Sequence, residues 1–121
     1  MKCLFLGYDK KKTRLINFLN KKKISVTHSK KNITLSQVEK FDLIICFGYR
    51  KIIKKKILSK VKRPILNLHP SYLPFNRGAY PNYFSFYYNT KKGVTIHEID
   101  KNLDTGPIIF QKEIKFNIQK N

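Results

Sequence analysis

The sequence predicts an α/β protein, with a mostly parallel sheet that carries helices on both faces. Short apolar stretches typical of buried strands alternate with segments whose apolar residues recur at helical spacing. Residues 43–47 are apolar throughout and are followed by Gly48, which is typical of a central parallel strand buried on both faces. The 121 residues are enough for one domain, and no linker or internal repeat divides them.

The first half of the chain alternates strand and helix. Residues 2–6 form a short apolar run that ends at Gly7, which predicts a buried strand and a turn. In residues 13–20 the apolar side chains form a helical stripe, which a lysine-rich stretch closes. Residues 24–29 alternate Ile and Val with polar residues and predict a second strand, and residues 41–47 predict the third.

The second half begins with a helix and ends with strands. Residues 51–61 place Ile, Leu and Val at helical spacing with Lys outward, and residues 65–69 form a strand that Pro70 stops. An aromatic-rich helix is predicted over residues 79–89. Two late strands are predicted at residues 94–99 and 108–116, with a turn at 104–107 between them.

Positive charge dominates the composition. The chain has 26 Lys and Arg against 7 Asp and Glu, a formal charge of +19. Residues 1–63 contain 19 of these basic and 3 of these acidic residues, which leaves 7 and 4 for the remainder. Such a field attracts nucleic acid, anionic membranes or phosphorylated small molecules. The alternative is a lysine-prone compositional background with solvated side chains, and the composition does not decide between them.

Two classes of protein are disfavoured. The apolar runs are far shorter than the ~20 residues that span a bilayer, and the apolar stretch at the N-terminus is too short for a signal peptide. Cys3 and Cys46 both lie in apolar runs, which favours buried free thiols in a reducing compartment. We therefore expect a cytoplasmic protein without membrane contact. We also expect no metal site.

Three polar residues could carry chemistry. Asn67 and His69 alternate about Leu68, so on a strand both face the same side. Asp104 begins a tight turn that could bring its carboxylate near the imidazole. An amide donor, an imidazole and a carboxylate suffice for acyl transfer without a protein nucleophile. Each residue also has an ordinary structural explanation, and spacing alone favours that explanation.

The motifs around these residues resemble the formyltransferase family that uses 10-formyltetrahydrofolate. They are Asn-Leu-His-Pro-Ser-Tyr-Leu-Pro at 67–74, Arg-Gly-Ala-Tyr-Pro-Asn at 77–82, Gly-Val-Thr-Ile-His-Glu-Ile-Asp at 93–100 and Leu-Asp-Thr-Gly at 103–106. The family includes glycinamide ribonucleotide, methionyl-tRNA and nucleotide-linked amino-sugar formyltransferases. The similarity runs from about residue 41 to about residue 113, and it looks closest to the amino-sugar branch.

The resemblance implies a minimal Rossmann-like fold in which residues 1–121 form a single catalytic domain, shortened at both ends relative to the family. It implies that Asn67, His69 and Asp104 are the catalytic set. The implied folate site consists largely of backbone groups after the central strand and in the aspartate loop. Its implied residues are Tyr49, Arg50, Ile52, Ile53, His97, Asp100 and Asp104.

The implied activity is formyl transfer from 10-formyltetrahydrofolate to a primary amine, with a nucleotide-linked amino sugar as the favoured acceptor. Glycinamide ribonucleotide and methionyl-tRNA are alternative acceptors, so tRNA stays open as a partner. A homodimer is expected, because a shortened chain should leave part of the sheet uncovered. A hypothesis of another class is a basic module that kept the fold, lost turnover and binds polyanions.

Overall fold

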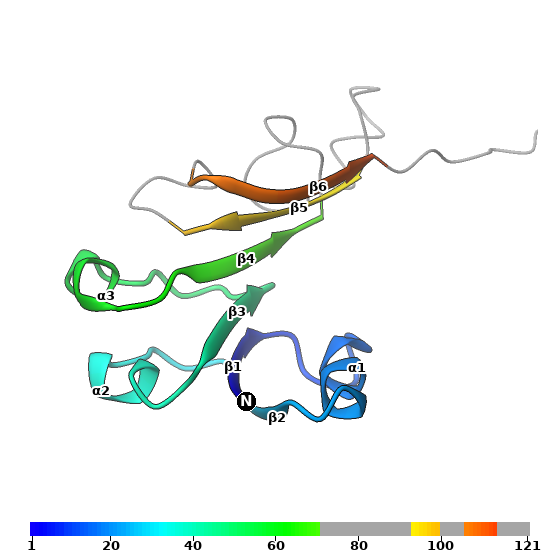
Figure 1. Cartoon of the computed structure of the whole chain (residues 1–121), viewed down its shortest axis with the longest axis horizontal. Coiled ribbons are helices and arrows are strands. Elements are labelled where there is room, and N and C mark those ends of the chain that lie inside the picture. Colours follow the sequence, from blue (N-terminus) through cyan, green and yellow to red (C-terminus); the bar gives the residue numbers. More distant parts are fainter. Residues whose placement is uncertain (71–92, 100–105, 114–121) are drawn as a thin grey trace, which may run out of the picture.

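The computed structural model describes residues 1–70, 93–99 and 106–113 (Figure 1). The elements, in chain order, are β1 (Lys2–Gly7), α1 (Leu15–Lys21), β2 (Ser25–Ser29), α2 (Leu35–Val38), β3 (Leu43–Phe47), α3 (Lys55–Lys60), β4 (Ile65–His69), β5 (Gly93–Glu98) and β6 (Ile108–Glu113). The helix predicted at 79–89, the start of the turn at 104–107 and the end of the strand predicted at 108–116 lie outside the described residues.

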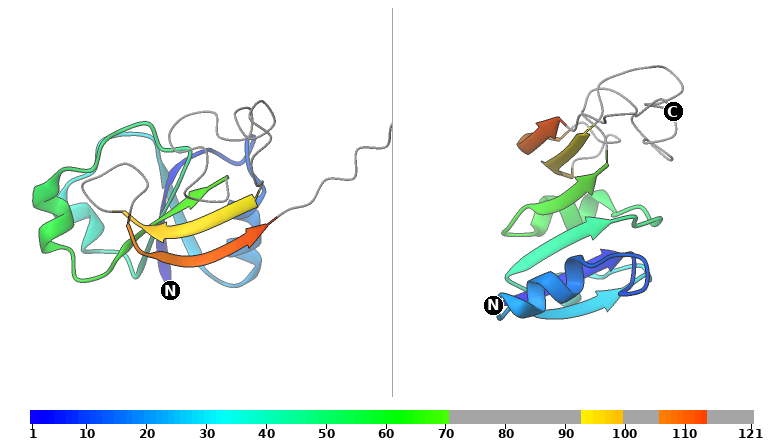
Figure 2. Two further views of the ribbon diagram at one scale, coloured as in Figure 1. Left: turned by 90° about the horizontal axis from the view of Figure 1, so that it is seen from above. Right: turned by 90° about the vertical axis from the view of Figure 1, so that its right-hand side faces the viewer.

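The strands form one six-stranded sheet in the order β2-β1-β3-β4-β5-β6. The pairings from β2 to β4 are parallel, whereas β5 pairs antiparallel with both β4 and β6. Figure 2 shows β5 and β6 running side by side in opposite directions. The predicted α/β class is confirmed, and the apolar run at 43–47 is a central strand between β1 and β4.

Helices cover both faces of the parallel part of the sheet. Ile16 and Leu19 of α1 pack against Cys3 and Phe5 of β1 on one face. On the other face, α2 and α3 pack against the alternate residues of β1 and β3 (Figure 1). The buried residues of this second cluster are Leu4, Leu6, Val38, Ile44, Cys46, Ile53, Ile57 and Ile65. No helix among the described residues is long and apolar enough to cross a membrane.

The short helix α2 is absent from the sequence prediction. A capping box begins it: the Gln37 N–H donates to Thr34 Oγ1 at 3.3 Å, and the Thr34 N–H donates to Gln37 Oε1 at 2.9 Å. The Thr-x-x-Gln spacing was available as a signal, but four residues show no helical periodicity.

The helix predicted at 51–61 is shorter than expected. Helix α3 starts only at Lys55, because the backbone of Lys54, the residue before it, is extended.

Gly7 brings the carboxyl end of β1 against β3. Its φ is +118°, and a Cβ there would meet the Phe47 carbonyl oxygen. The next residue, Tyr8, donates its N–H to that same oxygen at 2.9 Å. The chain can therefore leave β1 only if residue 7 has no side chain.

We predict that Gly7→Ala lowers the free energy of unfolding by about 2 kcal/mol or more, because it adds backbone strain to a clash with main-chain atoms. Chemical denaturation followed by circular dichroism measures the change. Asn17→Ala, on the exposed surface of α1, is the control and should stay within about 0.5 kcal/mol of the wild type. Equal stabilities of the two variants would contradict the strained turn.

Candidate active site

Two strands bring the candidate catalytic residues together. In the antiparallel pairing of β4 with β5, Asn67 lies opposite His97 and His69 lies opposite Thr95. Asn67 is also the neighbour of Cys46 on β3, whose side chain belongs to the core on the α2 and α3 side. Side chains alternate along a strand, so these four polar side chains on β4 and β5 lie on the same face of the sheet as Cys46. The predicted same-face placement of Asn67 and His69 is confirmed.

This polar group is deeply buried. His69, His97 and Thr95 are only 4 %, 1 % and 0 % exposed, and they are the buried polar side chains of the described ranges. Burying such groups costs free energy unless they are hydrogen-bonded. Their arrangement is therefore fixed by specific partners.

Hydrogen bonds connect the polar side chains across the sheet. The Asn67 Nδ2 atom lies 3.2 Å from His97 Nε2, and His97 Nδ1 lies 2.9 Å from the Glu98 carbonyl oxygen. The two imidazole rings are 6.4 Å apart between centroids and meet edge to face. On β6, the Gln111 side chain donates from Nε2 to Thr95 Oγ1 at 3.1 Å.

An imidazole and an amide on neighbouring positions can move a proton and stabilise a developing negative oxygen. Both sit at the carboxyl end of the last parallel strand, where ligands of open α/β sheets bind. Asp100 and Asp104, the carboxylates of the predicted site, lie outside the described residues.

The remaining predicted site residues follow β3. The Tyr49 hydroxyl donates to the Lys31 carbonyl at 2.6 Å, and burial followed by the neighbouring Cys46 raises the pKa of this phenol. Arg50 is exposed. Ile52 is 89 % exposed whereas Ile53 is 8 % exposed and packs in the core. The structure therefore does not present both isoleucines to one surface, and Ile52 is the one open to a ligand.

Sequence reasoning missed Thr95 and Gln111. Thr95 could have been found, because it alternates with His97 along a predicted strand and so shares its face. Gln111 could not, since its contact with Thr95 depends on the register between β5 and β6, which contains an irregularity at Ile96 and His97.

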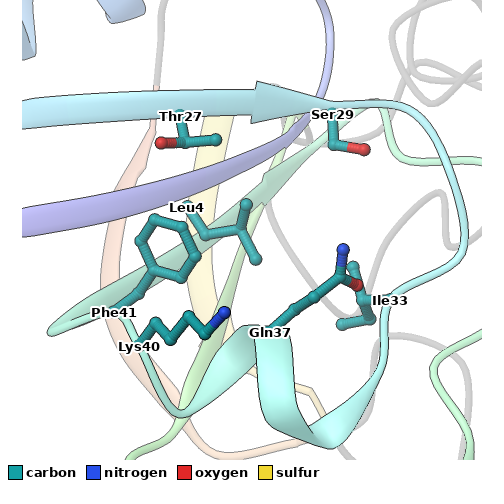
Figure 3. A pocket seen from close by; sticks show the side chains of 7 residues that line it. All are labelled: Leu4, Thr27, Ser29, Ile33, Gln37, Lys40 and Phe41. Carbon is teal, nitrogen blue, oxygen red and sulfur yellow. The ribbon is translucent and has the colours of Figure 1, made fainter.

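A separate hollow of about 230 Å³ lies between the edge strand β2 and helix α2 (Figure 3). Helix α2, which has only four residues, borders it through Gln37. Its lining is Leu4, Thr27, Ser29, Ile33, Gln37, Lys40 and Phe41. None of the predicted site residues lines this hollow. Within the described ranges, no group of three His, Cys, Asp or Glu side chains is placed to hold a metal ion.

Both cysteines are free and buried, as the sequence predicted. Burial raises the pKa of Cys46 to about 12 and that of Cys3 to about 11. At neutral pH both thiols are protonated and therefore poor nucleophiles, although Cys46 neighbours Asn67 in the sheet.

We predict that neither thiol of the folded protein reacts measurably with a disulfide reagent at pH 8, because only the thiolate attacks. Both should react at once in denaturant, which serves as the control. Rapid reaction of one thiol in the native protein would contradict this prediction. It would support a mechanism in which that cysteine acts as a covalent nucleophile.

Comparisons with known proteins identify the family of this chain. The Formyl transferase family matches residues 7–120. A dTDP-4-amino-4,6-dideoxyglucose formyltransferase of Mycobacterium bovis is 43 % identical over 76 residues, which are 63 % of this chain and 32 % of that protein. A methionyl-tRNA formyltransferase of Thermodesulfovibrio yellowstonii is 44 % identical over 82 residues, 67 % of this chain and 26 % of that protein.

Among solved structures, the formyltransferase PseJ from Anoxybacillus kamchatkensis matches with a TM-score of 0.81 and 42 % identity. The match covers 97 % of this chain and 62 % of that one, and PseJ was solved with UDP-4,6-dideoxy-4-formamido-L-AltNAc and tetrahydrofolate. The chain thus spans about a third or less of the curated relatives' length. The family match, which covers nearly the whole sequence, shows that this chain belongs to the formyl transferase family.

Proposed function

We propose that this protein transfers a formyl group from 10-formyltetrahydrofolate to a primary amine on a nucleotide-linked sugar. The observation that carries the proposal is the buried pairing of Asn67 and His69 with His97 and Thr95 at the carboxyl end of β4. The likeness to PseJ, which was solved with a formamido sugar nucleotide and tetrahydrofolate, supports the choice of both substrates.

The reaction balances without a redox partner. The amine nitrogen forms a bond to the formyl carbon, the bond between that carbon and the folate nitrogen breaks, and one amine proton passes to the departing nitrogen. Negative charge develops on the formyl oxygen as the amine attacks, and this charge needs hydrogen-bond donors in a site that excludes water.

The residues of the polar group fit these requirements. Asn67 can donate an amide N–H to the developing oxyanion, and His69, at the end of β4, can stabilise it in its charged form and move protons. Asp104 is proposed to support His69. A pterin needs amide-like hydrogen-bond partners beside an apolar surface, which the backbone after β3 and the exposed Ile52 can supply.

We predict that Asn67→Ala and His69→Ala each lower kcat by about 100-fold or more, because each removes a stabilising group of the transition state. Formation of the formamide, followed by mass spectrometry of the acceptor, measures the loss. His28 provides a matched control, because it lies on the edge strand β2, away from β4 and β5, and donates to the Gly7 carbonyl. His28→Ala should therefore keep nearly full turnover. Wild-type turnover in His69→Ala, with the fold intact, would remove His69 from the mechanism.

The charge of the acceptor is the second part of the proposal. Lysines follow the parallel strands at their carboxyl ends, including Lys54, Lys55 and Lys56 at the start of α3. The loops of this edge contact one another: Lys30 after β2 pairs with Asp9 after β1 at 3.3 Å, and Tyr49 after β3 bonds to Lys31. This basic edge would attract the diphosphate of a nucleotide-linked acceptor.

A matched pair of triple variants tests this part. Lys54, Lys55 and Lys56 lie at the start of α3, in the chain that follows the carboxyl end of β3, whereas Lys21, Lys22 and Lys23 lie at the end of α1, just before β2 begins. Changing either set to Gln removes the same charge. We predict that the first variant lowers kcat/KM for the acceptor by about threefold or more at low salt and leaves kcat unchanged. The second should change kcat/KM much less.

Salt supplies the internal check of the same experiment. The difference in kcat/KM between the two variants should shrink as ionic strength rises from about 0.01 M to 0.1 M, because the screening length falls from about 30 Å to about 10 Å. Equal effects of both variants would mean that only net charge matters. Salt-sensitive nucleic-acid binding by a protein with no folate site would instead support the polyanion-binding hypothesis.

A further inference from the structure

We propose that His97 is a positioning residue that fixes which way the Asn67 amide points. The inference rests on the proposed function, in which an N–H of Asn67 faces the developing oxyanion. His97 is 1 % exposed and lies directly opposite Asn67 in the β4 and β5 pairing, so the two side chains cannot easily separate.

The hydrogen bond to Glu98 determines the tautomer of His97. A carbonyl oxygen only accepts, so the 2.9 Å contact requires a proton on Nδ1. A neutral imidazole has one ring proton, which leaves Nε2 with a lone pair. The atom of Asn67 that lies 3.2 Å away must then be the amide nitrogen, acting as the donor.

The two hydrogen bonds of His97 therefore set the direction of the Asn67 amide. Turning the amide over would place its carbonyl oxygen against the Nε2 lone pair. The bond would be lost and two acceptors would face each other in a buried site, which is unfavourable. The turned amide would also direct its oxygen, and not an N–H, toward the oxyanion.

Three substitutions separate this role from simple packing. In His97→Gln, the side-chain carbonyl can reach the position of Nε2 and still accept from Asn67. In His97→Asn, the shorter amide reaches only the position of Nδ1. It keeps the bond to the Glu98 carbonyl but provides no acceptor for the Asn67 amide. His97→Leu fills the space and makes neither bond.

We predict that His97→Gln stays within about threefold of wild-type kcat, while His97→Asn and His97→Leu lose about tenfold or more of kcat. A role confined to stability would rank the variants by their melting temperatures. Asn retaining activity better than Gln, or activity that simply follows melting temperature, would overturn the proposal.

Nitrogen-15 spectroscopy of the histidine rings gives a readout that does not need turnover. The proposal requires a protonated Nδ1 and an unprotonated Nε2 in His97 at neutral pH. The opposite tautomer would overturn it even in an active enzyme. If the wild type formylates no amine, the proposed function fails on its own, while the tautomer measurement still decides whether His97 directs the amide.

Discussion

The register between β4 and β5 is the constraint on which the candidate site depends. One antiparallel pairing sets Asn67 against His97 and His69 against Thr95, on the face that otherwise holds the apolar core of α2 and α3. A slip by one residue would turn these side chains to the opposite face. Strand β4 is also paired with β3, so main-chain hydrogen bonds on both of its sides hold Asn67 and His69 in place.

Burial and chemistry are coupled in this arrangement. The sheet changes from parallel to antiparallel at β4, so the carboxyl end of the last parallel strand lies beside the start of β5. There the buried His69, His97 and Thr95 continue the apolar layer, and hydrogen bonds are stronger in such a low-dielectric environment. The same environment strengthens the stabilisation of a developing charge. Burial in the same core raises the pKa of Cys3 and Cys46, which disfavours their nucleophilic thiolate forms at neutral pH.

Much of the fold could be predicted because its signals are local. The apolar run of β3 and the alternation in β4 identified the central strand and the shared face of Asn67 and His69. Helix α2 was missed because four residues are too few for a period, and α3 was overextended because Ile52 and Ile53 fit the helical spacing of the apolar residues that follow. The Asn67 to His97 bond and the Gln111 to Thr95 bond depend on strand register, which short sequence patterns do not encode.

The histidine rings provide the most direct test, since the chain has three and only two lie in the candidate site. Titrating tetrahydrofolate while recording the carbon-13 and nitrogen-15 signals of His28, His69 and His97 locates the ligand against an internal control. We predict saturable shifts at His69 and His97, with His28 on β2 unmoved. Saturable binding that moves His28, or that leaves His69 and His97 unchanged, would contradict a folate-dependent site at the carboxyl end of β4.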